Sequence, residues 1–501
     1  MSYLSIGINI ITGLVYTPWM ISSIGKENYG LYTLAYSVIA FFMFDFGLSG
    51  AITRFVSKYL AEDRQDKANN CLGLVYKLYF YIDIIIFIIL STVYFFIPEI
   101  YKELTTDEIE KFKVVYAIAA IYSVLSFPFI PVNGILTATE RFVPLKLCEV
   151  CQKILIVVTM SLCLLLGYGL YALVLVNVFA GIVTIIVKLW MIKRYTRISV
   201  NLKYKNKYEF KEIVNFSGWT TIVALAQRFV FSIVPTLLGM FTGSAAIAVF
   251  GIANILEGYV YTFANAIGGM FLPKVSRVYA QGNNSVVLPL MIKVGRIQYM
   301  VVAVVIIGFM CLGEDFIYLW VGESFSESFI CTVLIIVPSF LSCPQQIAGE
   351  AVLAKNKVKK QALIYFWTSI FNIVSACLFI YWWGAIGACV SICATYMIRW
   401  LLTNIYLYSR ELNIDISRFY KDSLLKFLPA FTCAAMVGIV LNVFSTDISF
   451  WVFSSKSIIF SIVYIGGIYL CMNQYEKDLM IRPILKYLKN KYNGNRSENR
   501  R

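Results

Sequence analysis

Runs of about 20 apolar residues dominate the chain from its first residues to about position 472. A helix needs about 20 such residues to cross the roughly 30 Å hydrocarbon core of a bilayer. The runs are continuous rather than alternating, which excludes a transmembrane β-barrel. The pattern predicts an all-α membrane protein with about 14 transmembrane helices. The expected helices are 3–24, 30–53, 71–97, 114–139, 147–166, 170–192, 216–240, 246–272, 294–313, 329–353, 362–381, 385–407, 427–446 and 452–472.

The composition agrees with a membrane protein and excludes several kinds of chemistry. Of the 501 residues, 59% are hydrophobic and 14% are charged, against roughly 25% charged in soluble proteins. Histidine is absent, which excludes His-based triads, His–metal sites and His proton relays. The pair Cys148 and Cys151 has no second ligand pair nearby, so we expect neither a metal nor a cofactor.

Lysine and arginine are distributed unevenly among the segments between the spans. Loops 54–70, 140–146, 193–215, 273–296, 354–361 and 408–426 and the tail 473–501 hold 33 of them, and the opposite loops hold four. The positive-inside rule therefore predicts that both termini are cytoplasmic. The net charge of +15 then indicates basic loops beside anionic membrane lipid rather than binding of nucleic acid. The first run follows no basic residue, so we interpret it as a span and not as a signal peptide.

Two groups of six spans resemble each other. Pro18 and Pro235 are 217 residues apart, Pro128 and Pro344 are 216 apart, and 30–35 matches 248–253 at 218. An even number of spans per copy predicts a parallel repeat with a substrate path between the halves. The expected divisions are an N-terminal six-helix lobe (1–192), a basic cytoplasmic linker (193–215), a C-terminal six-helix lobe (216–407), two additional helices (408–472) and a basic amphipathic cytoplasmic tail (473–501).

Ionisable residues inside the spans are the candidate functional groups, because each costs roughly 2.5–3.5 kcal/mol on insertion scales. Arg228 and Glu257 lie at similar distances from the turn between spans 7 and 8, which places them at one depth. They either form an ion pair that locks the two spans together or line a hydrated cavity as substrate-binding groups. Lys153, Lys188, Arg399 and Lys456 also lie within spans or at their edges.

The first half offers Asp45, Lys77 and Asp83. Asp45 is a candidate substrate-binding residue, with a helix cap or lock as the structural alternative. Lys77 is another candidate; it could pair with Asp45, or its side chain could reach the membrane interface, as lysines near span ends do. Asp83 is a candidate for ion coupling. Pro18 and Pro235 are candidate hinges for alternating access, with ordinary helix kinks as the alternative.

The run from Tyr16 to Tyr32, the segment Phe44-Asp-Phe-Gly-Leu48 and Arg54 resemble the opening of the oligosaccharide flippase (polysaccharide exporter) family. This family is part of the multidrug/oligosaccharidyl-lipid/polysaccharide exporter superfamily. Its members usually carry a short basic segment before the first span, and the printed sequence starts without one.

The resemblance implies a function. It implies a flippase that moves polyprenyl-diphosphate-linked oligosaccharide to the outer leaflet of the bacterial plasma membrane, with polysaccharide-assembly proteins as further partners. It also implies that Arg228 is the span 7 cation presented to the lipid diphosphate. The alternatives are a drug or peptidoglycan-precursor exporter of the same superfamily, and an enzyme such as an O-antigen polymerase or membrane glycosyltransferase. An enzyme would need a catalytic outer loop, and the longest outer loops have only about 16 residues without a nucleophile–base pair.

Overall fold

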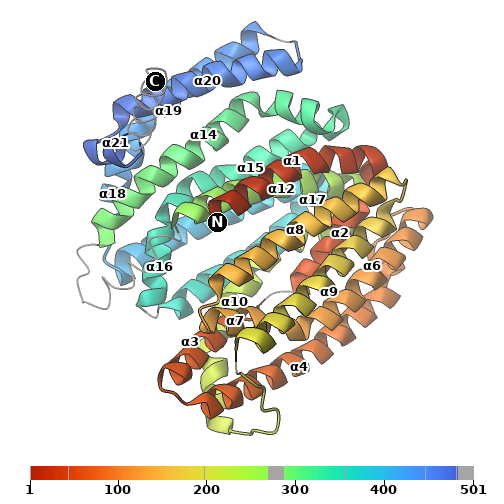
Figure 1. Ribbon diagram of the computed structural model, residues 1–501. Coiled ribbons are helices and arrows are strands. Elements are labelled where there is room, and N and C mark those ends of the chain that lie inside the picture. Colours follow the sequence, from red (N-terminus) through yellow and green to blue (C-terminus); the bar gives the residue numbers. More distant parts are fainter. Residues whose placement is uncertain are drawn as a thin grey trace, which may run out of the picture. The chain divides into compact units, whose positions relative to one another are not determined.

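The computed structural model describes residues 2–42, 45–196, 198–268, 287–355, 357–445, 447–480 and 482. Every regular element in these ranges is helical, in agreement with the predicted all-α class (Figure 1). The α-helices are α1 (Ser2–Ile24), α2 (Lys26–Phe42), α3 (Leu48–Ala61), α4 (Gln65–Phe95), α5 (Ile97–Ile100), α6 (Thr106–Ser126), α7 (Pro131–Ala138), α8 (Phe142–Leu165), α9 (Leu170–Tyr195), α10 (Lys207–Phe231), α11 (Val234–Phe241), α12 (Ser244–Gly268), α14 (Val287–Val321), α15 (Glu327–Ser342), α16 (Gln346–Ala354), α17 (Val358–Leu402), α18 (Ile416–Asp422), α19 (Leu424–Phe444), α20 (Phe450–Cys471) and α21 (Gln474–Met480). Short 3₁₀ turns are η1 (Phe127–Phe129), η3 (Glu323–Phe325) and η4 (Cys343–Gln345), and η5 (Thr403–Glu411) is π-helical.

Within the described residues, 11 helical segments are long and apolar enough to cross a membrane. One of them, Val358–Glu411, covers two expected spans, which are separated by a kink at Gly384. The first two expected spans are not among the 11, and the total of 14 stays a prediction. Most of the amphipathic helix expected in the tail lies outside the described residues.

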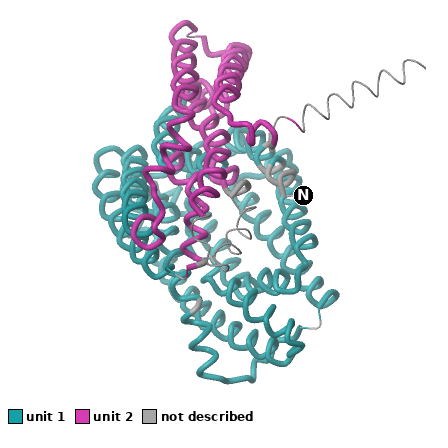
Figure 2. The backbone as a smooth tube through the Cα atoms, turned by 90° about the vertical axis from the view of Figure 1, so that its left-hand side faces the viewer, with its two compact units in different colours: residues 1–259, 323–338, 356–407 teal, residues 260–322, 339–355, 408–501 magenta. Residues whose placement is uncertain are grey.

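The chain forms two compact units (Figure 2). Unit 1 comprises residues 1–259, 323–338 and 356–407, and unit 2 comprises 260–322, 339–355 and 408–501. In unit 1, α10 packs against α17, α3 against α7, and α8 against α9. In unit 2, α14 packs against α16, α19 and α20. Unit 1 includes residues from both sides of the proposed linker 193–215, whereas unit 2 includes only residues that follow it. The role of this linker as a lobe boundary stays a prediction.

The helix expected over 30–53 is not continuous, which corrects the prediction for span 2. α2 ends at Phe42 and α3 begins at Leu48, after Gly47, whose φ is +68°. Span 7 is broken too: α10 ends at Phe231, and α11 begins at Val234 with Pro235 in its first turn. Proline lacks the N–H that a continuous helix would need at this point.

The proline breaks recur at the spacing of the sequence repeat. Pro128 is the central residue of η1 between α6 and α7, and Pro344 is the central residue of η4 between α15 and α16. The helices that follow end at Ala138 and Ala354, which are again 216 residues apart. The same helix–turn–helix pattern in both copies supports an internal duplication.

Unit 2 contains two buried ion pairs. Arg296, which was expected in a cytoplasmic loop, lies inside α14 because this helix already begins at Val287. Its Nη2 donates to Glu476 Oε2 at 2.9 Å, and both side chains are almost fully buried. Lys456 on α20 lies 2.7 Å from Asp315 Oδ2 on α14. These pairs supply the partners that charges inside a membrane protein require.

In unit 1, α2 and the start of α12 approach each other closely at Gly30. A Cβ atom at this position would collide with the carbonyl oxygen of Ser244. We expect Gly30→Ala to destabilise the detergent-solubilised protein by about 1–3 kcal/mol, because it overpacks backbone against backbone. A lower thermal unfolding midpoint would report this. Gly218→Ala on α10 is the matched control, because nothing lies within 4 Å of its added Cβ. If Gly30→Ala lowers the thermal midpoint no more than Gly218→Ala does, the close contact at Gly30 is contradicted.

Candidate functional site

The break between α10 and α11 places a cation at a helix end inside an apolar segment. Arg228 lies in the last turn of α10, and its carbonyl accepts the hydrogen bond of Ser232 N at 2.9 Å. A basic side chain in the last turn interacts favourably with the partial negative charge of a helix C-terminus. The break therefore gives Arg228 a local electrostatic partner that a continuous span would not supply.

Arg228 has no side-chain counter-ion among the described residues. It is half-buried, and within the described part of the chain its guanidinium makes no hydrogen bond and no ion pair. Glu257 on α12 is also half-buried and likewise has no hydrogen bond or ion pair among the described residues. The ion pair considered for Arg228 and Glu257 is therefore not formed in this structure.

A buried polar network on α17 holds the end of α10. Asn372 Nδ2 donates to the carbonyls of Phe229 at 3.2 Å and Val230 at 3.4 Å. Asn372 Oδ1 in turn accepts hydrogen bonds from the hydroxyls of Ser391 and Thr395. All three side chains are almost fully buried. A network in which each member has a partner fixes geometry in a low-dielectric interior, so it positions the helix end that carries Arg228.

Asp45 lies in the break between α2 and α3. Its Oδ1 accepts hydrogen bonds from Ser49 N at 2.9 Å and from the Tyr79 hydroxyl at 2.8 Å. The first bond satisfies an orphan backbone donor in the first turn of α3, and the second ties α3 to α4. The geometry thus matches the cap-and-lock alternative for Asp45, and no ion pair with Lys77 is formed.

Lys77 on α4 contacts the segment between α9 and α10. Its Nζ donates to the carbonyl of Tyr204 at 2.7 Å, so its head group lies beside the basic linker. Asp83, two turns further along α4, has a buried Oδ1 without a hydrogen-bond partner. Pro18 lies inside the continuous helix α1, whereas Pro235 starts α11 after a break. The two proposed hinges therefore differ in local structure.

Arg399 on α17 is a group whose environment the sequence did not reveal. Its side chain is 4% exposed, and it stacks over the rings of Tyr365 at 4.3 Å and Tyr396 at 5.1 Å. Nε donates to Thr368 Oγ1 at 3.0 Å, but Nη1 and Nη2 are buried without a hydrogen-bond partner. Its position in an apolar run was the available signal. Because Arg399 lies near the end of that run, the sequence is equally compatible with a side chain that reaches the membrane interface.

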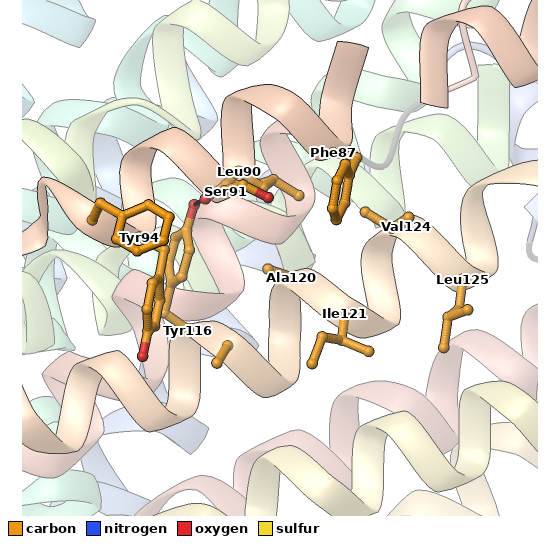
Figure 3. Close-up of a pocket in the computed structure, with 11 residues that line it drawn as sticks. Phe87, Leu90, Ser91, Tyr94, Tyr116, Ala120, Ile121, Val124 and Leu125 are labelled. Atoms are coloured by element: carbon orange, nitrogen blue, oxygen red, sulfur yellow. Dashed lines mark hydrogen bonds between the residues drawn. The ribbon is translucent and has the colours of Figure 1, made fainter. Parts of the chain in front are cut away.

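A groove between α4 and α6 has a volume of about 400 Å³ (Figure 3). Its lining is almost entirely apolar, with Phe87, Leu90 and Tyr94 from α4 and Ile121 and Val124 from α6. The groove has no charged lining residue, so it fits hydrocarbon and not a polar head group.

Replacement of Arg399 tests whether the protein keeps a buried guanidinium that lowers its unfolding free energy. We expect Arg399→Met to raise the unfolding free energy by about 1–3 kcal/mol, because it removes two unpartnered donors and still fills the volume. A rise of about 2–4 °C in the thermal midpoint would report it. Arg399→Lys keeps a buried charge and should give no such gain. A lower midpoint for Arg399→Met would show that aromatic stacking outweighs the unmade hydrogen bonds.

Solved structures of known transporters share this fold at low sequence identity. The lipid II flippase MurJ, in an inward closed conformation, is similar with a TM-score of 0.67 and 15% identity, over 96% of this chain and 99% of that chain. An inward-facing transporter of the MATE multidrug resistance family gives a TM-score of 0.66 and 15% identity, over 84% and 99%. A MOP superfamily transporter from Pyrococcus furiosus gives 0.56 and 14%, over 82% and 95%.

A search of curated protein sequences finds no match. The family model described as polysaccharide biosynthesis protein matches residues 1–279, which is more than half of the chain. With the fold of the MOP transporters, the chain belongs to this polysaccharide biosynthesis protein family.

Proposed function

We propose that the protein flips polyprenyl-diphosphate-linked oligosaccharide from the cytoplasmic to the outer leaflet of the bacterial plasma membrane by alternating access. The observation that carries this proposal is Arg228, whose guanidinium lies at a helix end within an apolar segment and has no ion-pair partner among the residues that the structure describes. The matched family concerns polysaccharide biosynthesis, and the solved proteins with this fold are transporters. A transporter is therefore favoured over a polymerase or glycosyltransferase.

The cargo needs a protein because its glycan cannot enter hydrocarbon unaided. Each unpartnered hydroxyl costs roughly 2–7 kcal/mol on transfer to an apolar medium. A hydrated path removes this penalty while the prenyl chain stays in lipid. The diphosphate is the anionic feature that such cargoes share, and a planar guanidinium binds phosphate with two parallel charge-assisted hydrogen bonds.

The other candidate residues take supporting roles in this proposal. Glu257 has no partner within the described ranges and lines the cargo path near Arg228, where its charge tunes the site. Lys77 contributes to the inner part of that path, and Asp45 supports it by holding the start of α3 against α4 through Ser49 N and the Tyr79 hydroxyl. Asp83 is the candidate for ion coupling. Pro18 and Pro235 are the hinges. Both termini are cytoplasmic, as the distribution of lysine and arginine predicts.

A second candidate cargo is a peptidoglycan precursor or a drug. The likeness to the lipid II flippase MurJ covers 96% of this chain. A lipid-linked peptidoglycan precursor would present the same diphosphate to Arg228. A cationic drug is disfavoured because Arg228 and Lys77 would repel it.

Complementation of a flippase-deficient strain tests the role of Arg228. Each lost charged hydrogen bond is worth about 1.5–3 kcal/mol, so we expect Arg228→Ala to reduce surface polysaccharide about tenfold or more. Arg228→Lys should keep partial activity, because it retains charge but not the bidentate geometry. Surface polysaccharide is measured by immunoblot at matched membrane levels of the protein.

Two further variants make the test specific. Arg64→Ala, at an arginine whose side chain is 57% exposed, should leave surface polysaccharide unchanged. The exchange of Arg228→Glu with Glu257→Arg should not restore activity, because these residues form no ion pair. Full activity of Arg228→Ala would overturn the cargo-binding role, and recovery by the exchange would indicate a lock.

A further inference from the structure

The segment before α10 is held against α4 by a set of hydrogen bonds. Ser199 N donates to Asn69 Oδ1 at 2.9 Å, and Asn201 Nδ2 donates to Asn70 Oδ1 at 2.7 Å. The two backbones meet at Gly73, where a Cβ atom would collide with the carbonyl of Asn201. Lys77 then donates to the carbonyl of Tyr204. This segment is therefore a built part of unit 1 and not a loose linker.

This contact borders an open cavity of about 670 Å³ whose charged lining residues are all basic. Lys77, Lys205 and Lys207 line it, and its other lining residues include no acid. Lys205 and Lys207 are exposed and form no ion pair or hydrogen bond among the described residues. The nearest acid along the chain, Glu209, accepts a hydrogen bond from the Tyr204 hydroxyl at 3.2 Å and does not line the cavity. The cavity thus presents uncompensated positive charge.

An exposed apolar stripe on α4 runs away from this cavity. Phe80 and Tyr81 belong to the cavity lining, and the stripe continues through Ile84, Phe87 and Ile88. These side chains are between 42% and 61% exposed. From Lys77 to Ile88 the helix rises about 16 Å at 1.5 Å per residue. One leaflet of the hydrocarbon core is about 15 Å thick, so the stripe matches a single acyl chain in length.

We infer that this cavity binds the head group of an anionic phosphoglycerolipid of the inner leaflet, with an acyl chain along the α4 stripe. The three lysines contact the phosphate, and Phe80 and Tyr81 lie where head group and chain meet. Basic pockets on the cytoplasmic side of membrane proteins recognise such head groups. The location at the inner interface rests on the orientation proposed above. The site shares Lys77 with the proposed cargo path, but Arg228, Lys205 and Lys207 are not shared between the two.

The geometry favours a resident membrane lipid over the diphosphate cargo. The stripe provides apolar contact for about one leaflet, which suits an acyl chain of ordinary length and not a much longer prenyl chain. Lysine ammonium groups are compact and strongly hydrated, so they suit a head group that remains at the water interface.

Lipid binding by the purified full-length protein tests the inference. Native mass spectrometry would measure binding of phosphatidylglycerol, with phosphatidylcholine and a polyprenyl diphosphate as comparison lipids. We expect one phosphatidylglycerol to bind in preference to phosphatidylcholine, and any polyprenyl diphosphate to bind independently of Lys205 and Lys207. Lys205→Gln with Lys207→Gln should weaken this binding about 25-fold, at about fivefold for each lysine near the surface. Both lysines are exposed, so the variant should fold.

The matched control is Lys203→Gln with Lys211→Gln, which removes the same charge from the same segment but does not touch the cavity. It should bind phosphatidylglycerol as the unaltered protein does. Three results would overturn the inference: an equal loss in the control, equal binding of phosphatidylcholine, or an equal loss of polyprenyl diphosphate binding when Lys205→Gln and Lys207→Gln are introduced. Because the assay measures no transport, failure of the flippase proposal would leave this result interpretable.

Discussion

The site depends on one constraint, which is that backbone groups freed inside a membrane must find partners within the protein. At the break between α10 and α11, Asn372 supplies a donor for the carbonyls of Phe229 and Val230. The same break creates a helix C-terminus, and the cation of Arg228 lies in its last turn. A proline break and an arginine are each costly in an apolar segment. Here the amide of Asn372 binds carbonyls at the break, and the new helix C-terminus interacts favourably with the arginine. Among the described residues, the guanidinium has no counter-ion.

Hydropathy predicted the fold class and most helix positions, because each apolar run is long enough to be recognised without knowledge of its neighbours. The helix expected from 170 begins at Leu170, and α19 and α20 lie within three residues of their expected bounds. The breaks were harder to predict. The turn at Asp45 and Gly47 occupies few residues in an otherwise apolar stretch, so a 20-residue average hides it. Proline identifies a break only when the surroundings supply donors for the freed carbonyls, as Asn372 does from more than a hundred residues away.

The candidate site shows the same difference between what the sequence predicts and what it does not. Charged residues in apolar runs can be found in the sequence, but their partners cannot. Equal depth for Arg228 and Glu257 follows from their distance to the turn, yet depth does not determine the direction in which each side chain leaves its helix. Lys77 contacts the carbonyl of Tyr204, and Asp45 contacts the hydroxyl of Tyr79. Both contacts depend on how separate helices pack, which no local pattern encodes.

The positions of the two kinds of cation follow from their hydration. Arginine keeps its charge in an environment of low dielectric constant and is more weakly hydrated than lysine, and Arg228 and Arg399 lie within apolar segments. Lys205 and Lys207 lie on an exposed segment, where an ammonium retains its water. A ligand that must leave water during its passage needs partners that have already been desolvated, and an arginine at a helix end is such a partner. A lipid that stays in its leaflet needs only charge at the interface. The placement of Arg228 in an apolar segment and of Lys205 and Lys207 at the surface is therefore what a protein would require if it moves one anionic lipid past another that remains in place.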